Sequence, residues 1–117
     1  MQVKGLKKDF DTPDGVKHAV AGVNLAMFEG QITCLLGHNG AGKSTTISML
    51  TGLIPPTAGF ARVMGLDLSS DMSDIRKIIG ICPQHDVLWD DLTVKEHLEF
   101  FAGLKGVPSN EVLWLPL

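Results

Sequence analysis

The sequence predicts a mixed α/β fold with an antiparallel β subdomain at its front. The first observation is a short apolar run, residues 31–36, of the kind that forms a strand buried on both faces. The second is a glycine-rich loop at residues 37–44, which leads into a stretch with helical spacing of apolar residues. The third is the alternation of apolar and polar residues around a tight-turn signal within residues 1–28. A chain of 117 residues allows one domain at most.

The front of the chain is predicted to form antiparallel strands. Residues 1–10 and 16–20 are expected to pair, because residues 12–15 (Thr-Pro-Asp-Gly) between them favour a hairpin turn. The Asp-Gly pair is expected to supply the positive φ angles of that turn. Residues 23–27 continue with a clean period of two, which predicts a further strand.

The middle of the chain is predicted to run from strand to loop to helix. Residues 31–36 form the strand, and residues 44–53 form a helix that ends at Gly52 and the Pro-Pro pair at 55–56. One face of this helix would carry apolar residues at steps of three: Ile47, Leu50 and Leu53.

The second half continues the alternation of strands and helices. Residues 60–64 and 78–82 are predicted strands, and residues 72–77 a short helix between them. A longer helix begins near residue 92, where Thr93 and Glu96 have the spacing of a capping box. The apolar positions of that helix share one face: Val94, Leu98, Phe101 and Leu104.

Composition excludes several classes of protein. The net charge of −3 and the lack of a basic stripe argue against nucleic acid as the main partner. No apolar run approaches the length that spans a bilayer, and residues 1–5 lack the apolar core of a secretion signal. Cys34 and Cys82 lie in strand-like runs, which favours two buried, reduced thiols over a disulfide or metal pair. The histidines have no metal-site spacing: His18, His38, His85 and His97.

Residues 37–44 (Gly-His-Asn-Gly-Ala-Gly-Lys-Ser) fit the phosphate-binding pattern of a glycine, four residues, then glycine, lysine and a hydroxyl residue. Glycines let backbone N–H groups approach a triphosphate closely, and the N-terminus of the following helix adds the positive end of its dipole. Lys43 would contact the β- and γ-phosphates, and Ser44 would offer its hydroxyl oxygen to Mg²⁺. The alternative is a glycine-rich turn before an ordinary capped helix, which the agreement of all required positions with both flanking elements disfavours.

Three stretches follow one another in a familiar order: Phe10, residues 37–46, and residues 82–86 (Cys-Pro-Gln-His-Asp). In these stretches the chain resembles the nucleotide-binding domains of ABC transporters, and the motif sequences are most similar to those of subfamily A, the lipid-exporting group. The resemblance covers residues 1–110, and residues 111–117 are interpreted as a divergent tail. It implies a phosphate-loop NTPase (RecA-like) core joined to the antiparallel β subdomain.

The resemblance also implies roles for individual residues, with ATP and Mg²⁺ as ligands. Gln84 matches the glutamine that completes the Mg²⁺ shell with Ser44 and senses the γ-phosphate, although an ordinary loop glutamine is the alternative. Phe10 takes the place of the aromatic ring that stacks on adenine, the alternative being a core residue at a strand end. Lys43 and Gln84 would support catalysis. The nucleotide would also be held by the loop and the helix start: Gly37, His38, Asn39, Gly40, Ala41, Gly42, Lys43, Ser44 and Thr45.

Other parts that the resemblance implies do not occur in this sequence. They are a hydrophobic strand ending in Asp-Glu, a Leu-Ser-Gly-Gly-Gln-like stretch, and a histidine after a later strand. The nearest approach to the acidic strand, residues 87–91, is short and is predicted to be a loop. We therefore expect a chain truncated before those motifs, which binds ATP better than it hydrolyses it and folds only marginally.

The partners implied by the resemblance are ATP, the transmembrane domains of a transporter and a second nucleotide-binding domain, at the cytosolic face of a membrane. In the complete protein the domain would couple ATP hydrolysis to transport of lipid or another substrate. Two alternatives stay open. One is a non-catalytic fragment that binds nucleotide or interferes with a full-length relative. The other is a different phosphate-loop protein, such as a GTPase or a small-molecule kinase, which the absence of an Asn-Lys-x-Asp guanine-reading motif disfavours.

Overall fold

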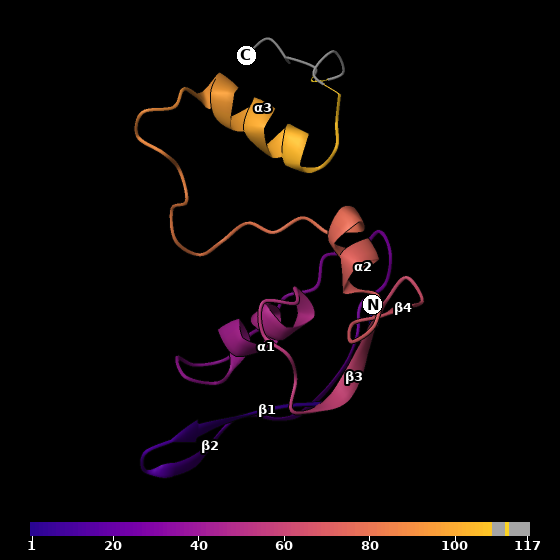
Figure 1. Cartoon of the computed structure of the whole chain (residues 1–117). Helices are drawn as coiled ribbons and strands as arrows, with labels where there is room; N and C mark the ends of the chain where they lie inside the picture. The colour runs from indigo at the N-terminus through magenta and orange to yellow at the C-terminus, as the bar shows by residue number, and fades with distance from the viewer. Residues whose placement is uncertain (109–111, 113–117) are drawn as a thin grey trace. The chain divides into compact units, whose positions relative to one another are not determined.

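The computed structural model describes residues 1–108 and Val112 in two compact units, residues 1–80 and the part from residue 81 onward. Figure 1 shows a sheet and two helices in the first unit and one longer helix in the second. The elements of the first unit are β1 (Gln2–Thr12), β2 (Gly15–Ala26), α1 (Lys43–Leu50), β3 (Ala58–Val63), β4 (Leu66–Asp67) and α2 (Met72–Ile78). The second unit contains α3 (Val94–Leu104). None of the helices among these residues is both long and apolar enough to cross a bilayer.

The sheet of the first unit is antiparallel throughout, with strand order β2-β1-β3-β4. The predicted front hairpin is confirmed, since Thr12 pairs with Gly15 across a two-residue loop. The predicted turn angles are half wrong, because Gly15 has φ +113° while Asp14 keeps a negative φ. The two segments predicted at 16–20 and 23–27 merge into the single strand β2. The β1–β2 hairpin is therefore formed by neighbouring parts of the chain, whereas the pairing of β1 with β3 joins distant ones.

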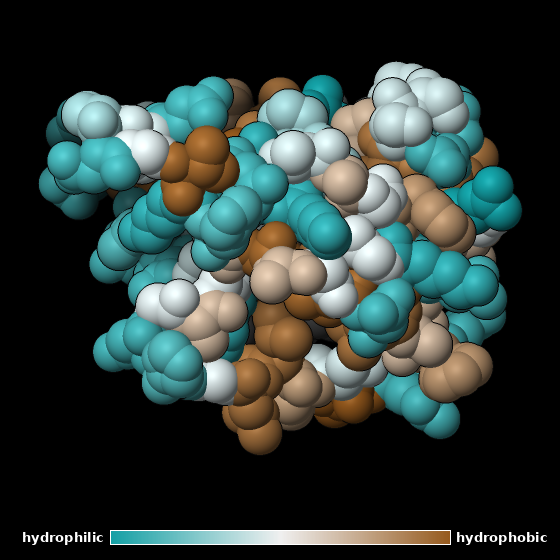
Figure 2. All heavy atoms as spheres, turned by 90° about the horizontal axis from the view of Figure 1, so that it is seen from below, coloured by the Kyte–Doolittle hydropathy of each residue, from teal (hydrophilic) through white to brown (hydrophobic). Residues whose placement is uncertain are grey.

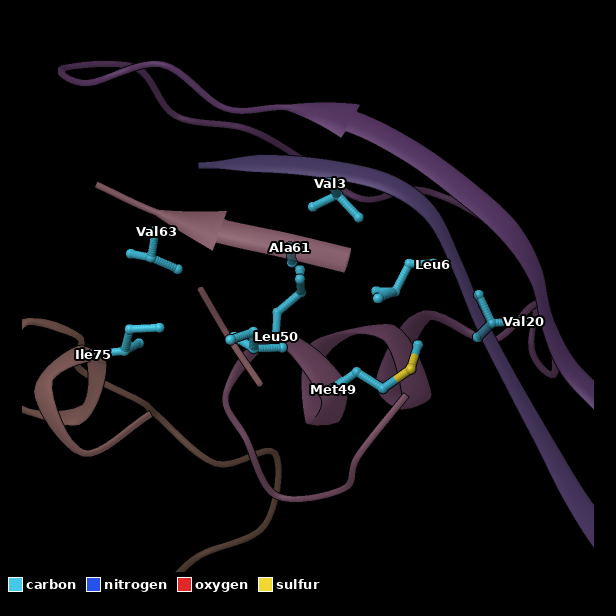
Figure 3. Close-up of a cluster of buried hydrophobic side chains, with 9 residues drawn as sticks. Val3, Leu6, Val20, Met49, Leu50, Ala61, Val63 and Ile75 are labelled. Atoms are coloured by element: carbon cyan, nitrogen blue, oxygen red, sulfur yellow. The ribbon is translucent and has the colours of Figure 1, made fainter. Parts of the chain in front are cut away.

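The core of the first unit lies between one face of the sheet and the helices (Figure 3). Leu6 of β1, Met49 of α1 and Ile75 of α2 are fully buried. The rest of the cluster consists of Val3, Val20, Leu50, Ala61, Val63 and Leu68. Burying a large aliphatic side chain contributes about 1.5–3 kcal/mol, so this small cluster holds α1 and α2 against the sheet.

The buried face of α1 differs from the predicted one. Thr46, Met49 and Leu50 are buried, whereas Ile47 is 50% exposed and Leu53 lies beyond the helix in open solvent. Only Leu50 of the predicted apolar face faces the core. Thr46, Met49 and Leu50 have the spacing i, i+3 and i+4 of one helical face. The buried face is therefore shifted by one residue from the predicted one, which assumed steps of three.

The two predicted central strands are not formed. Residues 31–36 have no regular structure, with Ile32 97% and Leu36 89% exposed, and residues 79–82 are irregular after the end of α2. A strand buried on both faces needs hydrogen-bonded neighbours at both edges. The four-stranded sheet of the described residues offers these runs no neighbour. Figure 2 shows brown, hydrophobic side chains open to solvent among teal ones on one face of the molecule.

The prediction of buried cysteines is wrong for the same reason. Cys34 and Cys82 lie in these two irregular runs and are exposed, free thiols. Both are therefore expected to react with an aromatic disulfide reagent in native buffer at rates close to those in urea. The measurement is the absorbance of the released thiolate. A thiol that reacts only after denaturant is added would show that its segment is packed.

In the second unit, α3 begins at the predicted capping box. The Glu96 amide donates to Thr93 Oγ1 at 3.3 Å, and the Thr93 amide donates to Glu96 Oε2 at 2.7 Å. The predicted apolar face is exposed at all four positions, and His97 is the buried residue of the helix instead. Residues 87–91 form no strand, which confirms the predicted loop. The predicted tail at 111–117 lies outside the described residues except for Val112.

The capping box is expected to make α3 sensitive to acid. The Thr93 hydroxyl, and then the Thr93 backbone N–H, lower the pKa of Glu96 below its usual 4.5 by binding the carboxylate. A lowered folded-state pKa means that this stabilisation is present above about pH 4.5 and is lost as the pH falls through the folded pKa. The ellipticity at 222 nm should therefore fall in that range. Glu96→Gln should retain helicity without this acid step, whereas Thr93→Ala should reduce helicity at neutral pH. An acid step of the same size in Glu96→Gln would assign it to other carboxylates.

Candidate functional site

The loop before α1 is a tight curl of backbone. Gly40 and Gly42 both have φ +87°, and the Ala41 amide donates to the His38 carbonyl at 3.1 Å. Gly42 is the N-cap of α1, so the curl passes directly into the helix. Where left-handed residues alternate with ordinary ones, successive N–H groups turn toward one side and create a concave site for an anion.

The glycines are required for different reasons. A Cβ on Gly42 would lie 2.4 Å from the Ala19 carbonyl oxygen of β2, so the loop passes against the sheet without room for a side chain. A Cβ on Gly37 would meet the Ala41 Cβ at 3.1 Å, across the curl itself. A Cβ on Gly40 would meet nothing within 4 Å, so only its positive φ favours glycine there. Another backbone segment thus approaches the loop closely at Gly42, whereas the close neighbour of Gly37 is a side chain of the loop itself.

Lys43 folds back over this curl. Its Nζ donates to the Gly37 carbonyl at 2.6 Å and to the His38 carbonyl at 2.8 Å. Lys43 is also the first residue of α1, and the first turn of that helix contains no acidic residue. The ammonium group and the positive end of the helix dipole therefore act at one place.

The start of α1 leaves backbone donors available. Gly42 offers no side-chain cap, and the amides of Lys43, Ser44 and Thr45 have no acceptor within the helix. The Thr46 amide and the Thr46 hydroxyl both donate to the Gly42 carbonyl, at 2.8 and 2.9 Å. An anion at the loop would accept hydrogen bonds from these amides. The start of α1 therefore suits a phosphate group.

Thr46 is a positioning residue that sequence reasoning does not single out. Its side chain is buried and ties Gly42, the pivot of the loop, to the second turn of α1. The signal was a hydroxyl residue four positions after the glycine, the spacing at which a hydroxyl reaches the carbonyl one turn back.

The predicted Mg²⁺ ligands divide between the two units. Ser44 is exposed at the helix start, and Gln84 is exposed at a bend in the second unit. Among the described residues no cluster of His, Cys, Asp or Glu could hold a metal by itself. A magnesium ion would thus need the oxygens of a bound phosphate beside Ser44. The role of Gln84 stays a prediction.

Phe10 lies near the hairpin end of β1, opposite Lys17 of β2. It is 37% exposed and stands outside the buried core cluster, and Lys8 Nζ lies 5.1 Å from the centre of its ring. One ring is thus accessible next to a cation. Its stacking on adenine stays a prediction.

The comparisons with known proteins agree with this geometry. Residues 20–114 match the family described as ABC transporter. The chain is 57% identical over 111 residues to the phospholipid-transporting ATPase ABCA3 of Homo sapiens, covering 95% of the chain and 6% of that protein. It is 52% identical over 111 residues to ABC transporter A family member 5 of Dictyostelium discoideum, covering 95% of the chain and 7% of that protein. The dimeric structure of a bacterial ABC transporter cassette superposes with a TM-score of 0.78 at 28% identity, covering 89% of this chain and 47% of that one.

These matches confirm the α/β class with an antiparallel β subdomain and the resemblance to subfamily A. The chain spans 6–7% of the length of these two curated relatives and about half of the solved cassette. The phosphate-loop geometry and the family match over residues 20–114 point the same way. The chain belongs to the ABC transporter family.

Proposed function

We propose that this chain binds Mg-ATP through the loop and helix start at residues 37–45, as the front part of an ABC-type ATPase domain. The observation that carries the proposal is the curl that places the Lys43 ammonium, two positive-φ glycines and the open N-terminus of α1 around one concave site. Backbone amides in such a site suit the terminal phosphates of a nucleotide. In the absence of nucleotide, the Gly37 and His38 carbonyl oxygens hold the Lys43 ammonium group over the loop. Phosphate oxygens would replace these carbonyls when nucleotide binds.

Each residue has a separate task in this proposal. The glycines keep backbone donors close to the phosphates, Lys43 contacts the β- and γ-phosphates, and Ser44 would hold Mg²⁺. The metal, when bound, neutralises charge between the phosphates. Gln84 would complete the metal shell, and Phe10 would stack on adenine.

For the complete protein, we propose coupling of ATP hydrolysis to transmembrane transport, with lipid as the transported class. The support is the identity to a phospholipid-transporting ATPase over 95% of this chain. The same proposal places the domain at the cytosolic face of a membrane, against the transmembrane domains and a second nucleotide-binding domain. The solved cassette of similar fold is a dimer.

A second candidate is a non-catalytic fragment that binds nucleotide or interferes with a full-length relative. This candidate uses the same nucleotide site around Lys43 as the first and differs from it in activity, not in ligand. Turnover of ATP by the purified chain, alone and mixed with a full-length relative, separates the candidates. Inhibition of the relative without turnover by the chain favours the fragment, and turnover by the chain alone excludes it.

The test of nucleotide binding is a calorimetric titration with ATP in Mg²⁺ and again in EDTA. We expect binding to be tighter with Mg²⁺, and to be tighter for ATP than for AMP or sulfate. Ser44→Ala should reduce the gain from Mg²⁺ by roughly tenfold, because one oxygen ligand is lost. Ser48→Ala, one turn further along α1, is the matched control and should leave the titration unchanged. Equal binding of ATP, AMP and sulfate would refute the proposal.

A further inference from the structure

Both ring nitrogens of His97 are engaged inside the second unit. The ring is buried on α3, and its Nδ1 lies 2.9 Å from the Thr93 carbonyl oxygen. Its Nε2 lies 2.9 Å from the backbone amide nitrogen of Trp89, eight residues earlier. This second contact joins the loop before α3 to the helix.

These partners fix the protonation state of the ring. A carbonyl oxygen can only accept a hydrogen bond, so Nδ1 carries the proton and donates to Thr93. A backbone amide can only donate, so Nε2 must offer its lone pair to Trp89. The neutral Nδ1–H tautomer satisfies both partners. An imidazolium would set an N–H group against the Trp89 N–H, and the contact would be lost.

The ring contacts around His97 do not depend on this proton. The Trp89 indole stacks on the imidazole with centroids 5.7 Å apart and planes 25° apart. Phe100 meets the indole edge-on, and Phe101 stacks on it. Aromatic packing can therefore persist while the backbone contact breaks. The backbone N–H of Trp89 is thus the group whose hydrogen exchange reports protonation of His97.

The charged groups near His97 are mainly acidic. Glu96 lies one residue before His97 on α3, and its carboxylate is bound by Thr93. Asp90 and Asp91 follow Trp89 directly in the chain. Lys95 and Glu99 on the same helix pair with each other at 3.9 Å. Protonation of the ring acts on the Trp89 contact directly, because the protonated Nε2 can no longer accept the backbone N–H.

We propose that His97 is a pH-sensitive latch, whose neutral ring holds the backbone of Trp89 to α3 and whose protonation releases it. Trp89 follows Gln84 by five residues in one irregular segment, so the latch fixes the C-terminal end of the segment that carries Gln84. The consequence for nucleotide sensing rests on the proposed function. The latch itself does not, because both of its partners lie in the second unit.

The test measures amide hydrogen exchange of the 117-residue chain by NMR, without nucleotide. Exchange rates are divided by their intrinsic values at each pH, and the side-chain spectrum of His97 gives its tautomer and its titration. We expect the Nδ1–H tautomer at pH 8. The Trp89 amide should then be protected, and its protection should fall roughly tenfold in step with the titration of His97.

Two variants separate a latch from a merely structural histidine. His97→Gln places an amide oxygen near the position of Nε2, so the Trp89 amide should stay protected at every pH. His97→Asn is too short to reach Trp89 and should leave that amide unprotected at every pH, with α3 amides and ellipticity retained. An Nε2–H tautomer, or acid loss of Trp89 protection in His97→Gln, would overturn the latch. Loss of ATP binding with an intact latch would instead refute only the proposed function.

Discussion

Replacing Lys43 by alanine is expected to weaken Mg-ATP binding by one to two orders of magnitude. The Lys43 Nζ is held over the phosphate loop by the Gly37 and His38 carbonyls, at 2.6 and 2.8 Å. A charge-assisted contact to phosphate contributes about 1.5–3 kcal/mol, which corresponds to roughly 10- to 150-fold in the dissociation constant. The measurement is the calorimetric titration with Mg-ATP.

The matched control is Lys77→Ala. Lys77 is also a lysine of a helix in the first unit, but it is exposed and pairs with Asp74 at 2.7 Å. Its removal changes the net charge by the same amount and should leave the affinity within about twofold. If both variants bind Mg-ATP as tightly as the parent, the loop does not hold the phosphates. An equal loss of Mg-ATP affinity in both variants would show that net charge, and not the position of Lys43, causes the effect.

Replacing Gly59 by alanine is expected to destabilise the first unit by about 2–5 kcal/mol. Gly59 has φ +81°, and a Cβ there would lie 2.2 Å from the Gly5 carbonyl oxygen and 2.6 Å from the Leu6 amide nitrogen. A left-handed backbone costs ~1–2 kcal/mol for a residue with a Cβ. Overlap with the fixed backbone of β1 adds ~1–3 kcal/mol. The measurement is the urea midpoint of the chain.

Gly65→Ala provides the control for this substitution. Gly65 has nearly the same φ, +86°, but a Cβ there would meet nothing within 4 Å. It should therefore show only the backbone cost of ~1–2 kcal/mol. The difference in stability between the two variants isolates the contact between β1 and β3, which pair on either side of Gly59. Equal midpoints for both variants would mean that the strands can separate at this point without loss.

The parts predicted from the sequence are those fixed by neighbours in the chain. The hairpin between β1 and β2 follows from a Thr-Pro-Asp-Gly turn between alternating strands. The cap of α3 follows from two side chains three residues apart, Thr93 and Glu96. The curl of the phosphate loop follows from glycines whose positive φ angles few other residues adopt. Each feature needs only contacts within a few residues.

The parts that sequence reasoning predicted wrongly depend on distant partners. Residues 31–36 and 78–82 have the composition of buried strands, but no strand of the described sheet lies beside them. Cys34 and Cys82 are exposed with them. The apolar face predicted for α3 is exposed, whereas the packing of Trp89 buries His97 on the same helix.

The sequence by itself therefore determined the chemistry of the loop and the local elements, because turn angles, caps and glycine freedom are set by adjacent residues. Tertiary structure alone decided which apolar runs become strands and which face of α1 is buried. A hydrogen-bonded edge or a packed face exists only when another segment of chain lies against it.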